Sequence, residues 1–534
     1  MKKSIHIAIS ITFLVLILAS SSAWSVSKLE GYYEIQAALM RIERHWQFGP
    51  PEAEGMPRHY FELKYLSWPY ENLEAFFKLR AESNRDEYLT PEIEFKHPLY
   101  IGAEGHLKLR GDKWETFLFY RQNRFWIHDE PLLNLVDQDK IKNDNWGPQS
   151  SGIRADFWDL NLWKLHGIGG TFIYFDDGST FDWPDDDKGQ IADGTDNFIL
   201  RLRKYSFGDR LRIGSMFLRK DWTNTNVDRS YIPTSFNEVY SLDVAFYPRS
   251  FVPTGLTLGP VNLENSSWIT EFAISRDPFQ IETSDVRTYA NRYAFSAEVR
   301  NIRISNLIVH AWYNNFGENF RDYMSRRFDE DREFNRKQYH IEGIYLFPKK
   351  AITATVAYDF YKKRIIDEEG GNLRPTYNLY TELYIEFIKG FKGKIAYNRW
   401  HGFDASAEVF DFFTYPNLFA ELSVENKLAK VRIQARIRDW GTFREVVAYG
   451  YDMEFNATGK LKGYFRILNV NEETEARATV FAQIRYDLGY GAEFFVEYGD
   501  PWQSNNLAYS DQFVNEYSQD RISHRIKTFL KIYF

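Results

Sequence analysis

Hydrophobic and polar residues alternate with a period of two along most of the chain. From Ile522 to Phe534 every second residue is largely apolar, and Arg525, Lys527 and Lys531 lie between them on the other face. This pattern is typical of a β-strand with one face in an apolar environment. The runs exceed the about 5–6 residues of an ordinary soluble strand. They reach the about 9–11 residues that a tilted strand needs to cross a bilayer, so the pattern predicts membrane-crossing strands.

The connections between these runs alternate between short turns and long polar loops. Short turns are expected near His166-Gly167, Phe207-Gly208-Asp209, Asn301, Pro348-Lys349, Lys389-Gly390, Asn426-Lys427, Thr458-Gly459 and Leu488-Gly489. Long polar stretches are expected at 127–149, 176–195, 221–235, 315–335, 363–375, 401–414 and 500–519. This asymmetry predicts an all-β fold, a large antiparallel transmembrane β-barrel of about 20–24 strands with short periplasmic turns and long extracellular loops.

Aromatic residues gather at both ends of the expected strands. One set lies near the short turns and comprises Trp163, Phe207, Phe347, Phe391, Tyr486, Tyr490 and Phe534. The other set lies at the opposite strand ends and comprises Trp222, Trp312, Trp400, Trp440 and Trp502. Amphipathic rings prefer the headgroup level of a membrane, so the two sets predict two interfacial belts.

The N-terminus has the features of an export signal. Lys2 and Lys3 precede an apolar run over 5–18, and small residues at 21–23 form a cleavage site. We therefore predict a signal peptide at 1–23 and the barrel at 57–534. Residues 24–56 are expected to form a periplasmic lead-in, a first strand or a partial plug.

The composition excludes several kinds of binding site and partner. The chain has 534 residues and no cysteine, which excludes disulfides, thiolate zinc sites and iron–sulfur clusters. Its formal charge of -8 does not suit a nucleic-acid binder. Histidines are scattered without an HExxH motif, and the lone glycine cluster at 167–170 suits a turn. We expect no cofactor, no nucleic-acid partner and no enzymatic activity.

The alternating final strand ends in Lys531-Ile532-Tyr533-Phe534. Together with the paired turns and the export signal, this ending resembles Gram-negative outer-membrane β-barrel proteins of the porin-like class. The resemblance implies an outer-membrane location, contact with lipid and lipopolysaccharide, and recognition of Tyr533 and Phe534 by the barrel-assembly machinery. The arginine-rich inner faces are also loosely similar to porins of the alginate-export type. No single family is matched by motif.

The faces expected to line the lumen carry many arginines. The candidates for solute selectivity are Arg201, Arg203, Arg210, Arg212, Arg432, Arg436, Arg438, Arg477, Arg485 and Arg525, together with the acids Glu382 and Glu386. Rings of arginine select anions. The alternative is that the arginines pair with lumen acids and brace the wall. Inward aromatic residues such as Tyr380 and Phe481 either form a track for sugars or simply fill space.

Two long loops carry candidate chemistry. Clustered carboxylates at Asp182, Asp185, Asp186 and Asp187 either hold Ca²⁺ or form a solvated outer loop. The loop 315–335 mixes both signs of charge. It is expected either to fold inward as a constriction or to bind lipopolysaccharide phosphates.

These features together predict a channel for small polar or anionic solutes, saccharides among them. A barrel of this size encloses a lumen that side chains alone cannot fill. The alternatives are a structural or partner-docking barrel without an open pore and, less favoured, an outer-membrane hydrolase.

Overall fold

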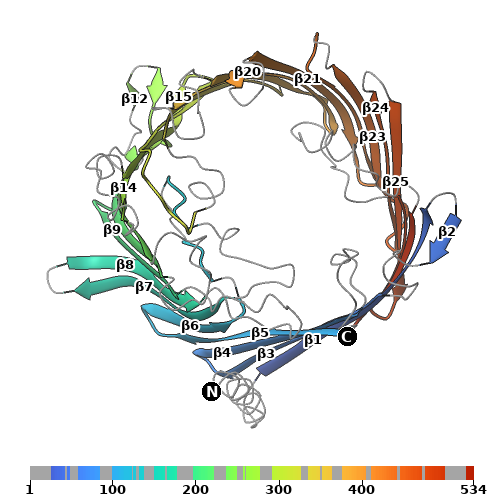
Figure 1. The fold of residues 1–534 in the computed structure, drawn as a ribbon, viewed down its shortest axis with the longest axis horizontal. Helices are drawn as coiled ribbons and strands as arrows, with labels where there is room; N and C mark the ends of the chain where they lie inside the picture. Colours follow the sequence, from blue (N-terminus) through green and yellow to red (C-terminus); the bar gives the residue numbers. More distant parts are fainter. Residues whose placement is uncertain are drawn as a thin grey trace.

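The computed structural model is a closed all-β barrel (Figure 1). Twenty-four antiparallel strands form the ring, which confirms the predicted fold class. The structure describes residues 26–42, 45–48, 58–83, 99–122, 124–127, 132–136, 150–162, 165–176, 196–221, 236–248, 257–258, 260–276, 292–325, 335–348, 351–363, 376–404, 411–441, 445–471, 476–499 and 525–534. The predicted signal peptide lies outside these residues. Among them, no helix is long and apolar enough to cross a membrane.

Each ring strand pairs with its neighbours in the sequence. The first half of the ring consists of β1 (Val26–Ile42), β3 (Arg58–Tyr70), β4 (Leu73–Ser83), β5 (Leu99–Arg110), β6 (Trp114–Tyr120), β7 (Ser151–Leu162), β8 (Leu165–Asp176), β9 (Asp196–Ser206), β10 (Leu211–Asp221), β11 (Phe236–Phe246), β14 (Ser267–Arg276) and β15 (Tyr293–Ile304). The second half consists of β16 (Leu307–Phe316), β17 (Arg336–Leu346), β18 (Ile352–Lys363), β19 (Thr376–Ile388), β20 (Phe391–Asp404), β21 (Asp411–Glu425), β22 (Ala429–Arg438), β23 (Val446–Asn456), β24 (Leu461–Asn471), β25 (Ala476–Gly489), β26 (Ala492–Tyr498) and β27 (Arg525–Tyr533). Three short strands lie outside the ring: β2 (His45–Phe48), β12 (Thr257–Leu258) and β13 (Val261–Asn262).

The ring closes where β1 pairs with both β3 and β27. Tyr32 stands opposite Glu62 on one side and Tyr533 on the other. Phe534 continues this seam, because its backbone exchanges hydrogen bonds of 2.9 and 3.0 Å with Gly31. Its ring also stacks on Phe61 with centroids 6.0 Å apart. Val26–Ile42 is therefore a wall strand, and β2 folds back onto the end of β1.

The two rims of the barrel differ in the length of their connections. Turns such as 71–72 and 389–390 join strands at what we call the short-turn rim, and the opposite end is the long-loop rim. The connection from β11 to β14 is a longer exception at the short-turn rim and carries β12 and β13.

Three of the expected turns lie a few residues from the positions named in the sequence. His166-Gly167 belongs to β8, and Leu488-Gly489 ends β25 before the turn. Asn301 lies inside β15 at a shift of register, with a φ of 58°, and the turn follows at 305–306. Asn and Gly tolerate positive φ in bulges as well as in turns, so these residues mark both features in a sequence.

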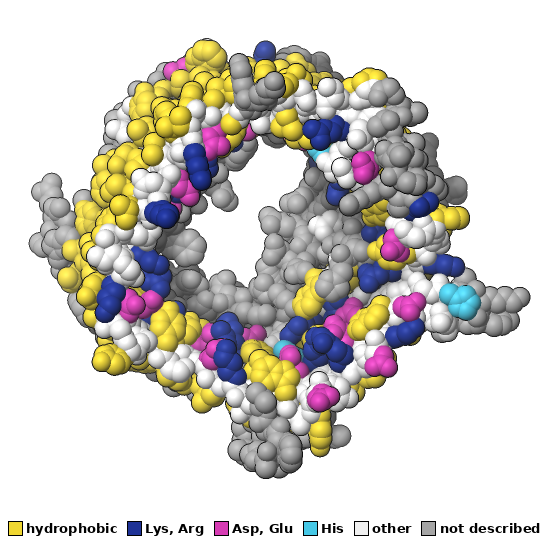
Figure 2. Space-filling model, turned by 180° about the vertical axis from the view of Figure 1, so that it is seen from behind, with side chains coloured by type: hydrophobic (Ala, Val, Ile, Leu, Met, Phe, Trp, Pro, Cys, Tyr) yellow, Lys and Arg dark blue, Asp and Glu magenta, His cyan; other side chains and the backbone are white. Residues whose placement is uncertain are grey.

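The wall has one apolar and one polar face. In β11 the outward Tyr240 and Leu242 are 47% and 54% exposed, whereas the inward Asn237, Ser241 and Asp243 are buried. Figure 2 shows hydrophobic side chains around the outside of the ring and charged ones along its inner wall. An exposed apolar surface this large marks contact with a membrane.

One expected member of the aromatic belts faces the other way. Trp312 shares the inner face of β16 with Asn314 and Phe316. Its ring stacks on His340 with centroids 5.3 Å apart, and His340 Nδ1 lies 2.6 Å from Asp359 Oδ1. The prediction that Trp312 lies at the lipid interface is therefore wrong, because its position near the strand end does not fix which face it occupies.

Candidate permeation pathway

Two connections fold inward from the long-loop rim. They are the first inward segment, of which residues 121–122, 124–127 and 132–136 are described, and the second inward segment, residues 317–325, both drawn inside the ring in Figure 1. Their apolar side chains pack on the inner wall between β6 and β16. The resulting buried cluster contains Phe119, Phe125, Ile127, Leu133, Leu135, Val136, Ile173, Phe175, Ile199, Met216, Leu218, Val239, Ala273, Ala294, Phe316, Phe320 and Met324.

Wall side chains accept hydrogen bonds from the backbone of both inward segments. The Leu133 amide donates to Glu271 Oε2 at 2.7 Å, and the Arg321 amide donates to Ser275 Oγ at 3.0 Å. The segments also bind each other, because Ser325 Oγ donates to the Asn134 carbonyl at 2.8 Å. Apolar burial and these hydrogen bonds together hold the described parts of both segments against the wall.

The start of the first inward segment is held by two further wall residues. Arg154, which is fully buried, donates to the carbonyls of Arg124 and Trp126 at 2.9 and 2.7 Å. Its charge is balanced by Asp156. His106 Nδ1 lies 3.0 Å from Gln122 Oε1. Burial, and then the neighbouring Arg154 charge, lower the pKa of the Arg124 guanidinium from its ordinary value.

The first group of candidate arginines, on β9 and β10, lies around a single acidic residue on β11. Arg201 on β9 and Arg212 on β10 both contact Asp243 on β11, the second at 3.1 Å. Arg201 and Asp243 are fully buried. Gly214 lies between them, and a Cβ there would displace the ends of both side chains. Arg203 lies on the same strand as Arg201, and Arg210 lies in the turn before β10.

The second arginine group is paired in the same way. On β22, Arg432 Nε lies 2.8 Å from Asp452 Oδ1, and Arg438 Nε lies 3.2 Å from Asp439 Oδ2. Arg436 is buried between them on the same face.

The remaining candidates fall into two sets. Arg485 pairs with Glu493. Arg477 and Arg525 lie on β25 and β27, and their side chains lie outside the described part of the structure.

The two acidic candidates have separate roles. Glu382 Oε2 lies 2.6 Å from Lys394 Nζ and also accepts a hydrogen bond from Tyr380. Glu386 accepts a hydrogen bond from the Gly390 amide at 3.1 Å, which fixes the turn between β19 and β20. Glu386 is therefore a turn residue at the short-turn rim, away from the middle of the lumen wall.

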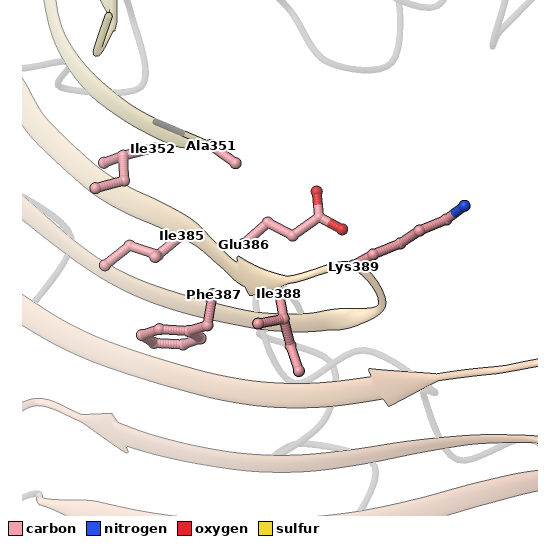
Figure 3. Close-up of a pocket in the computed structure, with 7 residues that line it drawn as sticks. All are labelled: Ala351, Ile352, Ile385, Glu386, Phe387, Ile388 and Lys389. Carbon is pink, nitrogen blue, oxygen red and sulfur yellow. The ribbon is translucent and has the colours of Figure 1, made fainter. Parts of the chain in front are cut away.

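Glu386 also borders a shallow cavity of about 600 Å³ at this rim. Ala351, Ile352 and residues 385–389 line it (Figure 3). Glu386 and Lys389 extend away from Ile385 and Phe387 in this view, so polar groups do not converge on one point. The cavity therefore lacks the convergent polar groups of a ligand site.

A further set of charges lines the wall from β3 to β5. Lys78 pairs with Glu104, and Arg80 Nε lies 3.3 Å from Glu62 Oε2. Lys64 Nζ lies 2.7 Å from the same Glu62. Described lumen charges are thus largely matched with opposite charges, which is the wall-bracing arrangement rather than a ladder of open arginines.

Sequence reasoning missed the acids and arginines that hold the inner structure. Asp243, Glu271 and Arg154 are not among the residues that the sequence singled out. Asp243 and Glu271 are each a single charged residue on an otherwise uncharged inner face, and Arg154 and Asp156 are an opposite-charge pair two residues apart, which are usable signals. The loop with Asp182, Asp185, Asp186 and Asp187 lies outside the described residues. Within them, no group of three or more His, Asp or Glu is placed to hold a metal ion.

The wall defines a class of protein: a large closed barrel with an apolar exterior and a charged, partly filled interior. The sequence matches no protein-family model and no curated protein. Among solved structures it is similar to the siderophore receptor PirA from Pseudomonas aeruginosa, with 8% identity over 95% of this chain and 81% of that one, at a TM-score of 0.43. It is also similar to the P pilus usher (PapC) translocation pore, with 10% identity over 95% and 99% of the two chains, at 0.38. A third similar structure is OccK11 (OpdR) from Pseudomonas aeruginosa, with 12% identity over 74% and 94%, at 0.34. Likenesses this distant assign neither a family nor an activity.

Proposed function

We propose that this protein is an outer-membrane channel through which small polar solutes, including saccharides and small anions, diffuse. The observation that carries the proposal is the closed ring of 24 strands with an apolar outside and a charged inside. A barrel of this size has a lumen too wide for wall side chains to fill. The predicted export signal at 1–23 and the terminal Tyr533 and Phe534 support delivery to that membrane by the barrel-assembly machinery.

The inward segments set the route and the size limit. They occupy the lumen beside β6–β16, so the path runs along the remaining wall, past Lys394 and Glu382. Charges along that path are paired, and paired charges produce weaker fields than open rings of one sign. We therefore expect weak ion selectivity and a preference for polar, hydrogen-bonding solutes.

The test is single-channel recording of the refolded, signal-free protein in a planar bilayer. Stable conductance steps with a reversal potential near zero under a salt gradient are expected. The variant Lys394→Gln leaves Glu382 uncompensated and should shift the reversal potential toward cation preference. The matched control, Lys427→Gln in a short turn, should not shift it.

Two results would count against the proposal. A folded barrel that never conducts would favour the partner-docking alternative, for which the two lumen-filling segments are the supporting observation. Conductance that is insensitive to Lys394 would mean that ions do not pass along this part of the wall.

A further inference from the structure

Two lysines stand directly opposite each other on the outward face of the wall. Lys337 is the second residue of β17, and Lys362 is the next-to-last residue of β18, so both lie at the long-loop rim. Both side chains are exposed. Within the described residues, neither has an ion-pair partner. Like charges directly opposite on neighbouring strands repel each other and destabilise the pairing.

The surface directly below the two lysines fixes their level in a membrane. Tyr339 stands opposite Phe360, with ring centroids 5.6 Å apart, and next to Tyr313, at 5.0 Å. Further along the same outward face come Ile341 and Val356, which are 55% and 51% exposed. Aromatic rings prefer the membrane interface and exposed aliphatic side chains prefer lipid tails. The two ammonium groups therefore lie at the height of the headgroups in the outer leaflet.

A second group of charges on the outward face, on β10, β11 and β14, is satisfied within the protein. Arg219 Nη1 lies 2.8 Å from Glu238 Oε1, and Arg219 Nη2 lies 2.7 Å from Asp221 Oδ2. Arg276 Nη1 lies 3.5 Å from the same Glu238. This cluster needs no outside partner, whereas Lys337 and Lys362 present two positive charges that no described residue of the protein neutralises.

We propose that Lys337 and Lys362 together bind a phosphate group of an anionic lipid headgroup in the outer leaflet. A phosphate carries the negative charge that relieves the repulsion between the two ammonium groups, and its oxygens accept hydrogen bonds from both. Attraction of lysines to an anionic membrane surface adds to this binding. The proposal rests on the membrane location given under the proposed function, but it does not depend on conductance.

The experiment titrates the refolded full-length mature chain in detergent with three probes. These are bisphosphorylated lipid A, the same glycolipid without phosphates, and inorganic phosphate, with bound lipid counted by native mass spectrometry. The phosphorylated glycolipid should bind at least tenfold more tightly than the other two. In Lys337→Gln/Lys362→Gln that preference should disappear. In the matched control Lys427→Gln/Lys460→Gln, which removes two exposed lysines from the short-turn rim, it should persist.

Several outcomes overturn the site. Equal binding of the phosphorylated glycolipid to the wild type and to Lys337→Gln/Lys362→Gln would do so, as would equal loss in the control variant. Binding of inorganic phosphate as tight as that of the glycolipid would show that the lipid is not the ligand. Folding of each variant is checked by heat-modifiable electrophoretic mobility. If the wild type conducts but shows no lipid preference, the lipid site alone is refuted. If it shows the lipid preference but never conducts, only the proposed channel function is refuted.

Discussion

Phe320 is the side chain whose removal should most directly loosen the second inward segment. It is fully buried in the apolar cluster that holds that segment against the inner wall. Truncating a buried phenylalanine to alanine costs about 3–5 kcal/mol. Because each 1.4 kcal/mol changes an equilibrium about tenfold, Phe320→Ala should raise the undocked fraction of the segment by on the order of 10²–10³-fold. The ring itself should remain closed, since its strands do not depend on Phe320.

The assay is single-channel recording of Phe320→Ala beside the wild type at the same voltage and salt. We expect new steps of larger conductance and more frequent transitions between levels. Phe320→Leu, which keeps much of the volume, should show fewer of them. Phe272→Ala is the matched control, because Phe272 is 42% exposed on the outward face of β14. If folded Phe320→Ala gives the same step sizes and transition rates as the wild type, the second inward segment does not border the path.

Two further predictions concern the paired charges. Asp243→Asn leaves Arg201 and Arg212 without their acid, and breaking such a buried pair costs about 3–5 kcal/mol. The barrel should therefore lose its heat-modifiable mobility at a lower temperature, and an unchanged transition would contradict the bracing role. Asp452→Asn removes the carboxylate 2.8 Å from Arg432, so the net charge of the lumen becomes more positive by one. The reversal potential should move toward anion preference, and a move toward cations would refute this assignment.

The architecture could be predicted from the sequence because alternation acts over every strand. Lipid outside and a polar interior force a period of two, so repeats such as Ile352–Lys363 show their two faces without any knowledge of their partners. The predicted strand range included the observed ring. Turn positions were less secure, because Asn301 and Gly167 have positive φ within strands.

The pairing of charges could not be predicted in the same way. Arg201 meets Asp243 across an intervening strand, 42 positions later in the chain. Which side chains meet across three strands depends on the register and tilt, and alternation alone leaves both open. The position of the inward segments could not be predicted for a similar reason. Their apolar residues, such as Leu133 and Met324, follow no strand period, and only the wall on which they pack gives them a place.

The seam between β1 and β27 has a consequence for how the barrel is made. Thr528 Oγ1 donates to the Ala37 carbonyl at 3.4 Å, joining groups that are 491 positions apart. No closed ring exists before β27 has been synthesised, so until then β1 presents an open edge that any other strand can join. During that interval the open edge of β1 must be kept from pairing with other strands. Pairing with β27, with Phe534 against Phe61, then covers this edge.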